Sequence, residues 1–225
     1  MVLPEIHHNG LVRERPGAQV WRQVKPWRSD MRLVMTALLA SLAVACSQPV
    51  TPGTWHLDAD RSALSFVSIK SGDIAETHSF SGLSGSVMAD GQAELVIDLA
   101  TIETGIGIRN ERMREHLFEI ERFADARVTA TLDLAALADL GAGERRALTL
   151  DAALDLHGVA MEIEAEVIVS EIDGRTILVE SRSPVIIDAA DHDLIDGLAT
   201  LQDLAGLPSI TPVVPVTFSL VFARS

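Results

Sequence analysis

The residue types best suited to chemistry in this 225-residue sequence gather between positions 188 and 196. This acidic cluster consists of Asp188, Asp191, His192, Asp193 and Asp196. Carboxylates beside an imidazole can bind a divalent cation, or can act as an acid and a base when their pKa values are pushed apart. The spacing matches neither a calcium loop nor a zinc motif, and the stretch lies between predicted strands. A solvated loop is therefore the favoured interpretation, and a metal-dependent hydrolase that uses this loop stays as an alternative.

Other candidate catalytic motifs are incomplete. The segment Ser81–Gly85 lacks the spacing of a nucleophile elbow, and Gly105–Gly107 is only half of a dinucleotide-binding fingerprint. Four further histidines show no i, i+4 pairing, and single histidines are more often hydrogen-bonding residues than ligands. They are His56, His78, His116 and His157. The sequence therefore predicts a protein that is not an enzyme and that has no cofactor and no metal.

The first 46 residues differ in character from the remainder. Residues 1–30 hold three prolines and two tryptophans without periodicity, and we interpret them as an upstream or disordered extension, with a genuine N-terminal arm as the alternative. Residues 31–46 begin with Met-Arg, continue with an uncharged apolar run and end at Cys46. This pattern is typical of an export signal, and the run is shorter than the roughly 20 residues that span a bilayer.

Cys46 is the only cysteine of the chain, so no internal disulfide can form. The segment Leu42–Cys46 looks like a lipobox, which would make Cys46 an acylated N-terminus and residues 47–53 a tether to the membrane. The stretch Ala43–Ala45 also satisfies the small-x-small rule of the ordinary signal peptidase, and this second possibility leaves Cys46 free. Both possibilities predict a periplasmic protein of the bacterial cell envelope, and the first predicts membrane anchoring.

Charge limits the range of partners. From Cys46 onward the chain has 12 Lys and Arg against 29 Asp and Glu, a net charge of −17. Such a surface repels phosphate backbones, so we expect no nucleic-acid partner. It also repels anionic bilayers, so any attachment to a membrane should depend on acylation of Cys46.

The clearest strand signal lies between residues 148 and 169. Apolar residues alternate with polar ones over 148–156 and again over 161–169, which is typical of an antiparallel sheet with one face in water. Nine residues extend about 30 Å, which is long for a small sandwich and suits a barrel. A hairpin turn is expected at His157-Gly158. Two further hairpins are expected at Asp90-Gly91 and Asp173-Gly174, because Asp-Gly readily takes the positive-φ positions of a type I′ turn.

Together these patterns predict that residues 54–225 form an all-β antiparallel barrel of about eight to ten strands with one or two short helices. One helix is expected to be capped by Asn110 and to place Met113 and Leu117 on one face. A second is expected over residues 200–206. Alternation does not reveal whether the barrel is hollow or filled. Prolines near the last strand could leave an edge free, so a homodimer is possible.

Five segments in this order resemble the YceI-like family, whose members are exported β-barrel proteins that hold lipid-like molecules. These segments are Trp55–Phe66, Thr77–Gly85, Ile102–Phe123, Leu156–Gly158 and Pro212–Val216. The resemblance covers almost the whole domain. It implies an elongated, lipocalin-like barrel that holds a long apolar molecule, of polyisoprenoid or fatty-acyl type, as a carrier or reservoir. The alternative within the same fold is a structural or stress-related envelope protein with a filled barrel and no ligand.

The resemblance also implies which residues face the ligand. The expected apolar contacts are Phe66, Phe80, Leu83, Ile97, Ile106, Ile108, Met113, Phe118 and Phe123. At the start of the predicted helix, Arg109, Asn110 and Arg112 are the candidates for contact with a polar or anionic head group.

Overall fold

The computed structural model describes residues 54–224. The predicted extension, export signal and tether, together with Cys46, lie outside the described residues. The elements are β1 (Trp55–Leu57), η1 (Ala59–Arg61), β2 (Ala63–Lys70), β3 (Ile74–Phe80), β4 (Leu83–Val87), β5 (Gln92–Asp98), η2 (Leu99–Thr101), β6 (Ile102–Glu103), α1 (Gly107–Arg112), η3 (Met113–Leu117), β7 (Asp125–Thr131), η4 (Leu134–Leu137), β8 (Arg145–Leu156), β9 (Val159–Glu171), β10 (Thr176–Ser181), β11 (Val185–Asp188), η5 (Ala189–His192), α2 (Ile195–Ala205) and β12 (Val213–Arg224).

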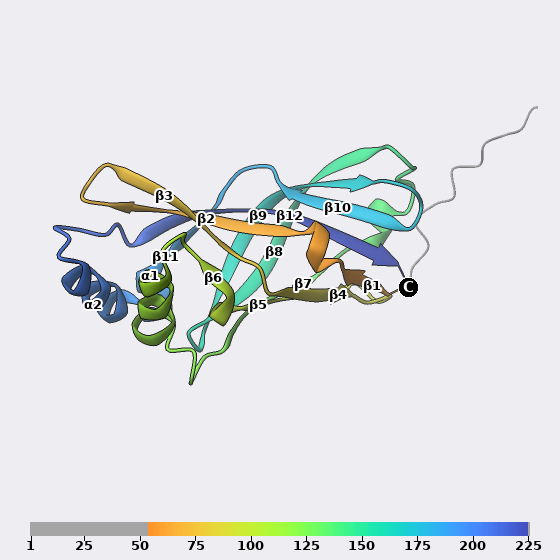
Figure 1. Ribbon diagram of the computed structural model, residues 1–225. Helices are drawn as coiled ribbons and strands as arrows, with labels where there is room; N and C mark the ends of the chain where they lie inside the picture. The colour runs from red at the N-terminus through yellow and green to blue at the C-terminus, as the bar shows by residue number, and fades with distance from the viewer. Residues whose placement is uncertain (1–53, 225) are drawn as a thin grey trace, which may run out of the picture. The chain divides into compact units, whose positions relative to one another are not determined.

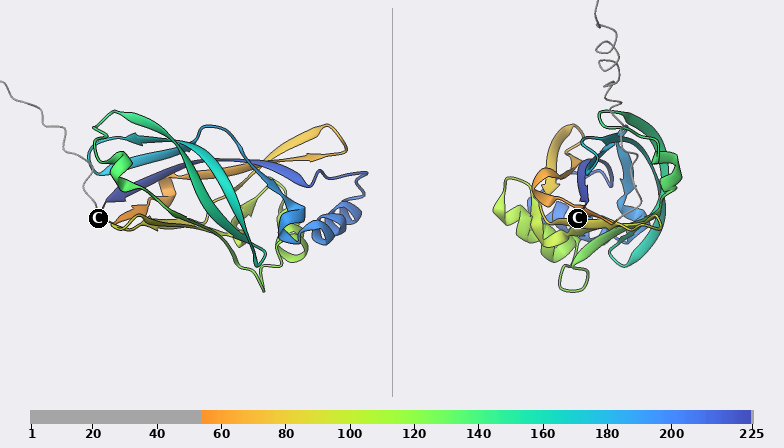
Figure 2. Two further views of the ribbon diagram at one scale, coloured as in Figure 1. Left: turned by 180° about the vertical axis from the view of Figure 1, so that it is seen from behind. Right: turned by 90° about the vertical axis from the view of Figure 1, so that its right-hand side faces the viewer.

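Eight strands close into an antiparallel barrel, as predicted. Their order is β1-β4-β5-β7-β8-β9-β10-β12, and β1 pairs back with β12 through Trp55 and Arg224. The end-on view in Figure 2 shows the strands as a ring. Closure leaves no exposed edge along the ring, which is the physical advantage of a barrel over an open sheet.

Four more strands lengthen the barrel. One edge of β12 pairs with β1 and β2, and its other edge pairs with β10 and β11. The short helix η1 separates β1 from β2, and residues 182–184 separate β10 from β11. The extension formed by β2, β3 and β11 lies toward the end of the barrel that carries α1 and α2 (Figure 1). The two helices thus cover one end of the sheet.

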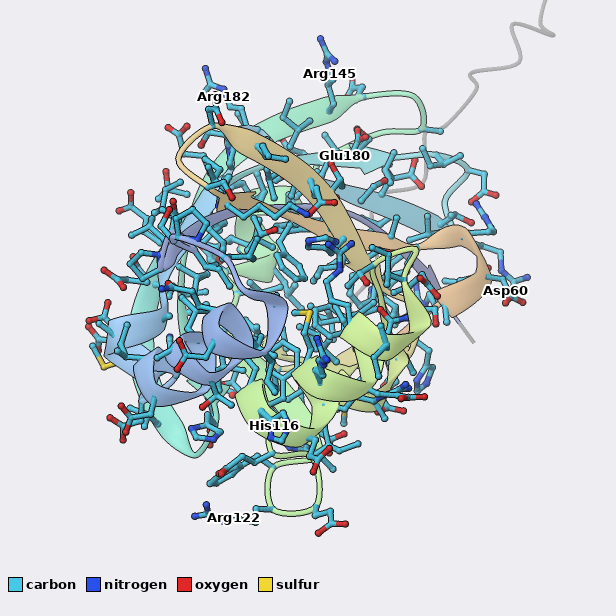
Figure 3. The ribbon with its side chains drawn as sticks, turned by 60° about the vertical axis from the view of Figure 1, so that its left-hand side comes forward. Asp60, His116, Arg122, Arg145, Glu180 and Arg182 are labelled. Carbon is cyan, nitrogen blue, oxygen red and sulfur yellow. The ribbon has the colours of Figure 1, made fainter. Side chains whose placement is uncertain are left out.

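The long β8–β9 hairpin follows the predicted alternation. Its turn places both His157 and Gly158 at positive φ, 56° and 77°, which is the backbone of a type I′ turn. Inward residues such as Leu154 and Val167 are buried, whereas Glu162, Glu164 and Glu166 are exposed. In Figure 3, Arg145 and Arg182 project away from the barrel into solvent. The acidic outer face and apolar inner face therefore belong to the same strands.

The two Asp-Gly hairpins are present, but the predicted turn type is wrong in both. Only the glycines, Gly91 and Gly174, have positive φ, at 89° and 80°. The Oδ1 atoms of Asp90 and Asp173 instead accept hydrogen bonds from the backbone N–H groups two residues ahead, at 3.1 and 3.0 Å. This local side-chain bond keeps each aspartate out of the left-handed region, so the loop is one residue longer than a type I′ turn.

Both predicted helices exist with different boundaries. Helix α2 begins earlier than predicted, at Ile195, and ends at Ala205, where Gly206 with φ 62° stops the helix as predicted. The prediction that Asn110 caps the other helix is wrong, because α1 begins at Gly107 and Asn110 lies inside it. The next turn, Met113–Leu117, is a π-helix that buries Met113 and Leu117 on the face that periodicity indicated.

Candidate ligand-binding site

The interior of the barrel forms a cavity of about 1180 Å³ that is open to solvent on part of its surface. Pockets for drug-sized ligands typically hold about 300–1,000 Å³, so this space suits a larger molecule. Its wall consists mainly of aliphatic and aromatic side chains from nearly every strand of the ring, from Trp55 in β1 to Phe222 in β12. The interior is therefore hollow, which argues against the filled-barrel alternative.

A row of aromatic rings runs along one wall of the cavity. The ring centroids of Phe66 and Phe80 lie 5.8 Å apart, and those of Phe80 and Phe118 also lie 5.8 Å apart. His78 joins the row through an edge contact of 5.2 Å with Phe66. These residues come from β2, β3 and the end of η3, and their packing gives the wall a fixed apolar surface.

One corner of the cavity is polar. Lys70 and Arg109 share the carboxylate of Glu76, whose Oε2 lies 2.6 Å from the lysine Nζ and 2.8 Å from the arginine Nη1. The second terminal nitrogen of Arg109 donates to the carbonyl oxygen of Thr104 at 2.5 Å. The hydrogen bond from Lys70, followed by the charge of Arg109, keeps the pKa of Glu76 below its usual value despite partial burial. Glu76 is therefore ionised at neutral pH.

His78 lies on the same strand as Glu76, on the same face. Only 3 % of its surface is exposed, and its Nε2 lies 2.8 Å from the hydroxyl of Ser68. Burial, reinforced by the positive charge of Arg109, lowers the pKa of His78. The imidazole is accordingly neutral at pH 7. We call Ser68, Lys70, Glu76, His78 and Arg109 the polar corner.

Helices α1 and α2 supply the cavity wall at the end that faces the viewer in Figure 3. Helix α2 contributes Leu198, Leu201 and Leu204 to the lining. The guanidinium of Arg112 in α1 donates to the carbonyl oxygen of Leu204 at 3.1 Å and so links the two helices. Gly197 lets α2 lie directly against η3, since an added Cβ there would be 2.4 Å from the carbonyl oxygen of His116.

Nine of the twelve residues predicted to face a ligand line this cavity. They are Phe66, Phe80, Ile97, Ile106, Ile108, Arg109, Arg112, Met113 and Phe118. Their contact with a ligand stays a prediction.

The other three predicted residues lie elsewhere. Leu83, the first residue of β4, is buried in the hydrophobic core. Phe123 packs outside against the β8–β9 turn, with its ring centroid 4.3 Å from that of His157. The Oδ1 of Asn110 accepts hydrogen bonds from the N–H and hydroxyl of Thr104, at 3.0 and 2.6 Å, so Asn110 closes the loop before α1.

Sequence reasoning missed four residues of the polar corner, namely Ser68, Lys70, Glu76 and His78. A signal for them was available. Phe66 was expected to face inward, and period-two alternation places Ser68 and Lys70 on its face of β2. In the same way, Phe80 places His78 and Glu76 on its face of β3. Polar side chains on an inward face are the informative observation, because they need partners inside the barrel.

Three residues of the acidic cluster, Asp188, Asp191 and His192, line a second, smaller pocket in the described part of the chain. Within residues 54–224, no three His, Cys, Asp or Glu side chains are arranged to hold a metal ion. Asp188 accepts a hydrogen bond from the N–H of Ala190 at 2.9 Å and begins η5. His192 is buried, and its Nδ1 lies 3.2 Å from the carbonyl oxygen of Val159, to which it must donate. These residues shape the chain between β11 and α2.

None of the helices among residues 54–224 is long and apolar enough to cross a membrane.

A closed antiparallel barrel with a hollow apolar interior and one polar corner defines a β-barrel protein of the ligand-binding class. The chain belongs to the YceI-like family, because the model of the YceI-like domain matches residues 55–222. Among solved structures, it is similar to a polyisoprenoid-binding domain from Saccharophagus degradans implicated in plant cell wall breakdown, at 44 % identity and a TM-score of 0.74. That match covers 76 % of this chain and 98 % of the other.

A second similar structure is BcnA of Burkholderia cenocepacia. It is 17 % identical, with a TM-score of 0.54, and the match covers 73 % of this chain and 98 % of BcnA. At this identity the likeness concerns the fold alone. No curated protein is significantly similar to the chain.

Proposed function

We propose that this protein binds one long apolar molecule, of polyisoprenoid or fatty-acyl type, inside its barrel. The observation that carries the proposal is the apolar cavity of about 1180 Å³. The relative from Saccharophagus degradans, which is 44 % identical, is described as a polyisoprenoid-binding domain and supports the same ligand class. The protein acts by binding rather than by catalysis.

The energetics favour a long ligand over a short one. Each 100 Å² of apolar ligand surface removed from water contributes about 2.5 kcal/mol. Association costs about 4–15 kcal/mol in lost translational and rotational freedom. A ligand therefore has to bury several hundred Å² before it binds tightly, and a long chain that follows the aromatic row of Phe66, Phe80 and Phe118 does so.

We propose that the protein works in the bacterial cell envelope as a carrier or reservoir, exported by the signal at residues 31–46 and attached to the membrane when Cys46 is acylated. Support comes from the sequence pattern alone, since these residues lie outside the described part. Mass spectrometry of the membrane fraction tests the attachment, and an unmodified Cys46 would contradict it.

Native mass spectrometry of the protein tests ligand binding directly. The full chain is produced in bacteria, purified without detergent, weighed intact and then extracted with organic solvent. We expect a discrete added mass that extracts as a long-chain apolar compound. Protein that is apo, and stays apo after incubation with polyisoprenoids and fatty acids, would refute the proposal.

A pair of variants connects the added mass to the cavity. Ala165 on β9 lines the cavity beside Leu150, its partner on β8, whereas the neighbouring Glu164 is exposed on the outer face. In Ala165→Phe the new ring occupies space that the ligand needs. Loss of about 100 Å² of ligand contact corresponds to about 2.5 kcal/mol, or more than tenfold in affinity. Glu164→Phe is the control and should keep the ligand. Equal loading of both variants would place the ligand outside the barrel.

A further inference from the structure

The polar corner has more hydrogen-bond donors than acceptors. Among residues 54–224, the buried Nε of Arg109 has no partner, and neither does Nδ1 of His78. Lys70 Nζ has three protons, and Glu76 is its ion-pair partner. Buried polar groups are nearly always satisfied in a working protein, so these atoms point to an acceptor that the chain itself does not supply.

The charges in the corner are also unbalanced. Lys70 and Arg109 share one carboxylate, that of Glu76, and His78 is neutral. One net positive charge remains on these partly buried side chains, of which Lys70 is 25 %, Glu76 28 % and Arg109 23 % exposed. The acidic lining residue Glu94 belongs to β5, and its carboxylate pairs with Arg127 at 3.0 Å. Asp133 accepts from the N–H of Ala135 at the start of η4. Asp151, on β8, is exposed. Because these side chains are partly shielded from water, the net positive charge attracts an anion more strongly than a fully exposed charge would.

The apolar path begins beside this charge. His78 contacts Phe66, and the row continues through Phe80 to Phe118. A ligand with its head in the corner can therefore lay its first carbons on the aromatic row without a gap. Four residues of the corner share β2 and β3 with Phe66 and Phe80 of the row, and the pairing of these two strands fixes their relative positions.

We propose that the polar corner is the head-group subsite of the cavity and that it selects a long-chain acid whose carboxylate carries one negative charge. Lys70 and Arg109 bind the carboxylate, and His78 Nδ1–H donates to it when the ring takes that tautomer, with Nε2 accepting from Ser68. The inference rests on the proposed function and adds the chemical class of the head group.

Competition between ligands of equal chain length tests the head group. The stripped full-length protein is offered hexadecanoate, hexadecan-1-ol and hexadecyl phosphate at pH 7.5, and the bound fractions are read by native mass spectrometry. We expect hexadecanoate to bind at least about tenfold tighter than the alcohol, which is the effect that one charge-assisted hydrogen bond supports. Equal binding of acid and alcohol would overturn the head-group inference and leave the proposed function standing. If none of the three ligands binds, both the head-group inference and the proposed function are overturned. Much tighter binding of hexadecyl phosphate than of hexadecanoate would overturn the inference that the head group carries a single negative charge.

Three substitutions separate recognition from folding. Lys70→Met and Arg109→Met should each remove the preference for hexadecanoate over hexadecan-1-ol, and urea unfolding of each variant reports whether the barrel is intact. Glu76→Gln removes the competing carboxylate and should raise hexadecanoate affinity about tenfold. A rise in affinity cannot come from a damaged fold. Unchanged or weaker acid binding by Glu76→Gln, with the alcohol still bound, would overturn the subsite.

Discussion

The contact between α2 and η3 predicts that a single methyl group at position 197 destabilises the protein. An added Cβ at Gly197 would lie 2.4 Å from the carbonyl oxygen of His116 and 2.9 Å from the Cα of Leu117. Both are backbone atoms, so no side chain can rotate out of the way. In Gly197→Ala, helix α2 therefore has to move away from η3 by about 1 Å, to an ordinary contact distance.

The expected cost follows from two opposing effects. Alanine is favoured over glycine in a helix by up to about 1 kcal/mol, whereas forcing an extra carbon into a packed contact costs about 1–3 kcal/mol. The displacement also loosens Leu198 and Leu201, which line the cavity from α2. We expect Gly197→Ala to lower the free energy of unfolding by about 1–2 kcal/mol.

Gly107 provides the matched control. It is also helical, in α1, and an added Cβ there has no atom within 4 Å. Gly107→Ala should be neutral or should stabilise the protein by at most about 1 kcal/mol. Urea unfolding measures both variants, and amide hydrogen exchange locates the change. We expect faster exchange in α2 for Gly197→Ala alone. If the two variants have equal stability, the reasoning about this contact is refuted.

Two further predictions concern buried polar side chains. Burial lowers the pKa of His78 in the folded protein, whereas in the unfolded chain the imidazole has its ordinary pKa of about 6.5. When the pH falls below about 6.5, the unfolded chain therefore binds a proton that the folded protein does not, and this favours unfolding. This contribution to stability is complete above that pH and is lost as the pH falls toward the folded-state pKa. His78→Gln should therefore flatten the decrease in unfolding free energy between pH 8 and 5.5, and an unchanged slope in urea titrations would contradict it. Asn110→Ala removes the acceptor of two hydrogen bonds from Thr104 and leaves a buried N–H unpaired. We expect a loss of about 1–3 kcal/mol in the same assay, together with unaltered ligand loading, since Asn110 does not line the cavity.

Local patterns in the sequence were sufficient to predict much of the fold. The alternation at residues 148–156 and 161–169 predicted the β8–β9 hairpin because the side-chain period of a strand is two. The Asp-Gly pairs predicted two more hairpins, although the turn type was wrong. The prediction that Asn110 caps a helix was also wrong, because its side chain accepts hydrogen bonds from Thr104 instead. Residue propensity alone does not distinguish a capping bond from a bond to a preceding loop.

The amino-acid sequence by itself determined that this chain builds an antiparallel barrel with an acidic outer face, because alternation and turn chemistry are local. Only the tertiary structure decided that the barrel is hollow, because an empty interior depends on how inward side chains from all eight strands of the ring fill the space between them. It alone also formed the polar corner. Alternation can place Lys70 and Glu76 on the inward faces of their strands. Their ion pairs form because β2 pairs with β3 and because Arg109 of α1 reaches Glu76, and such contacts between separate elements cannot be read from any single segment.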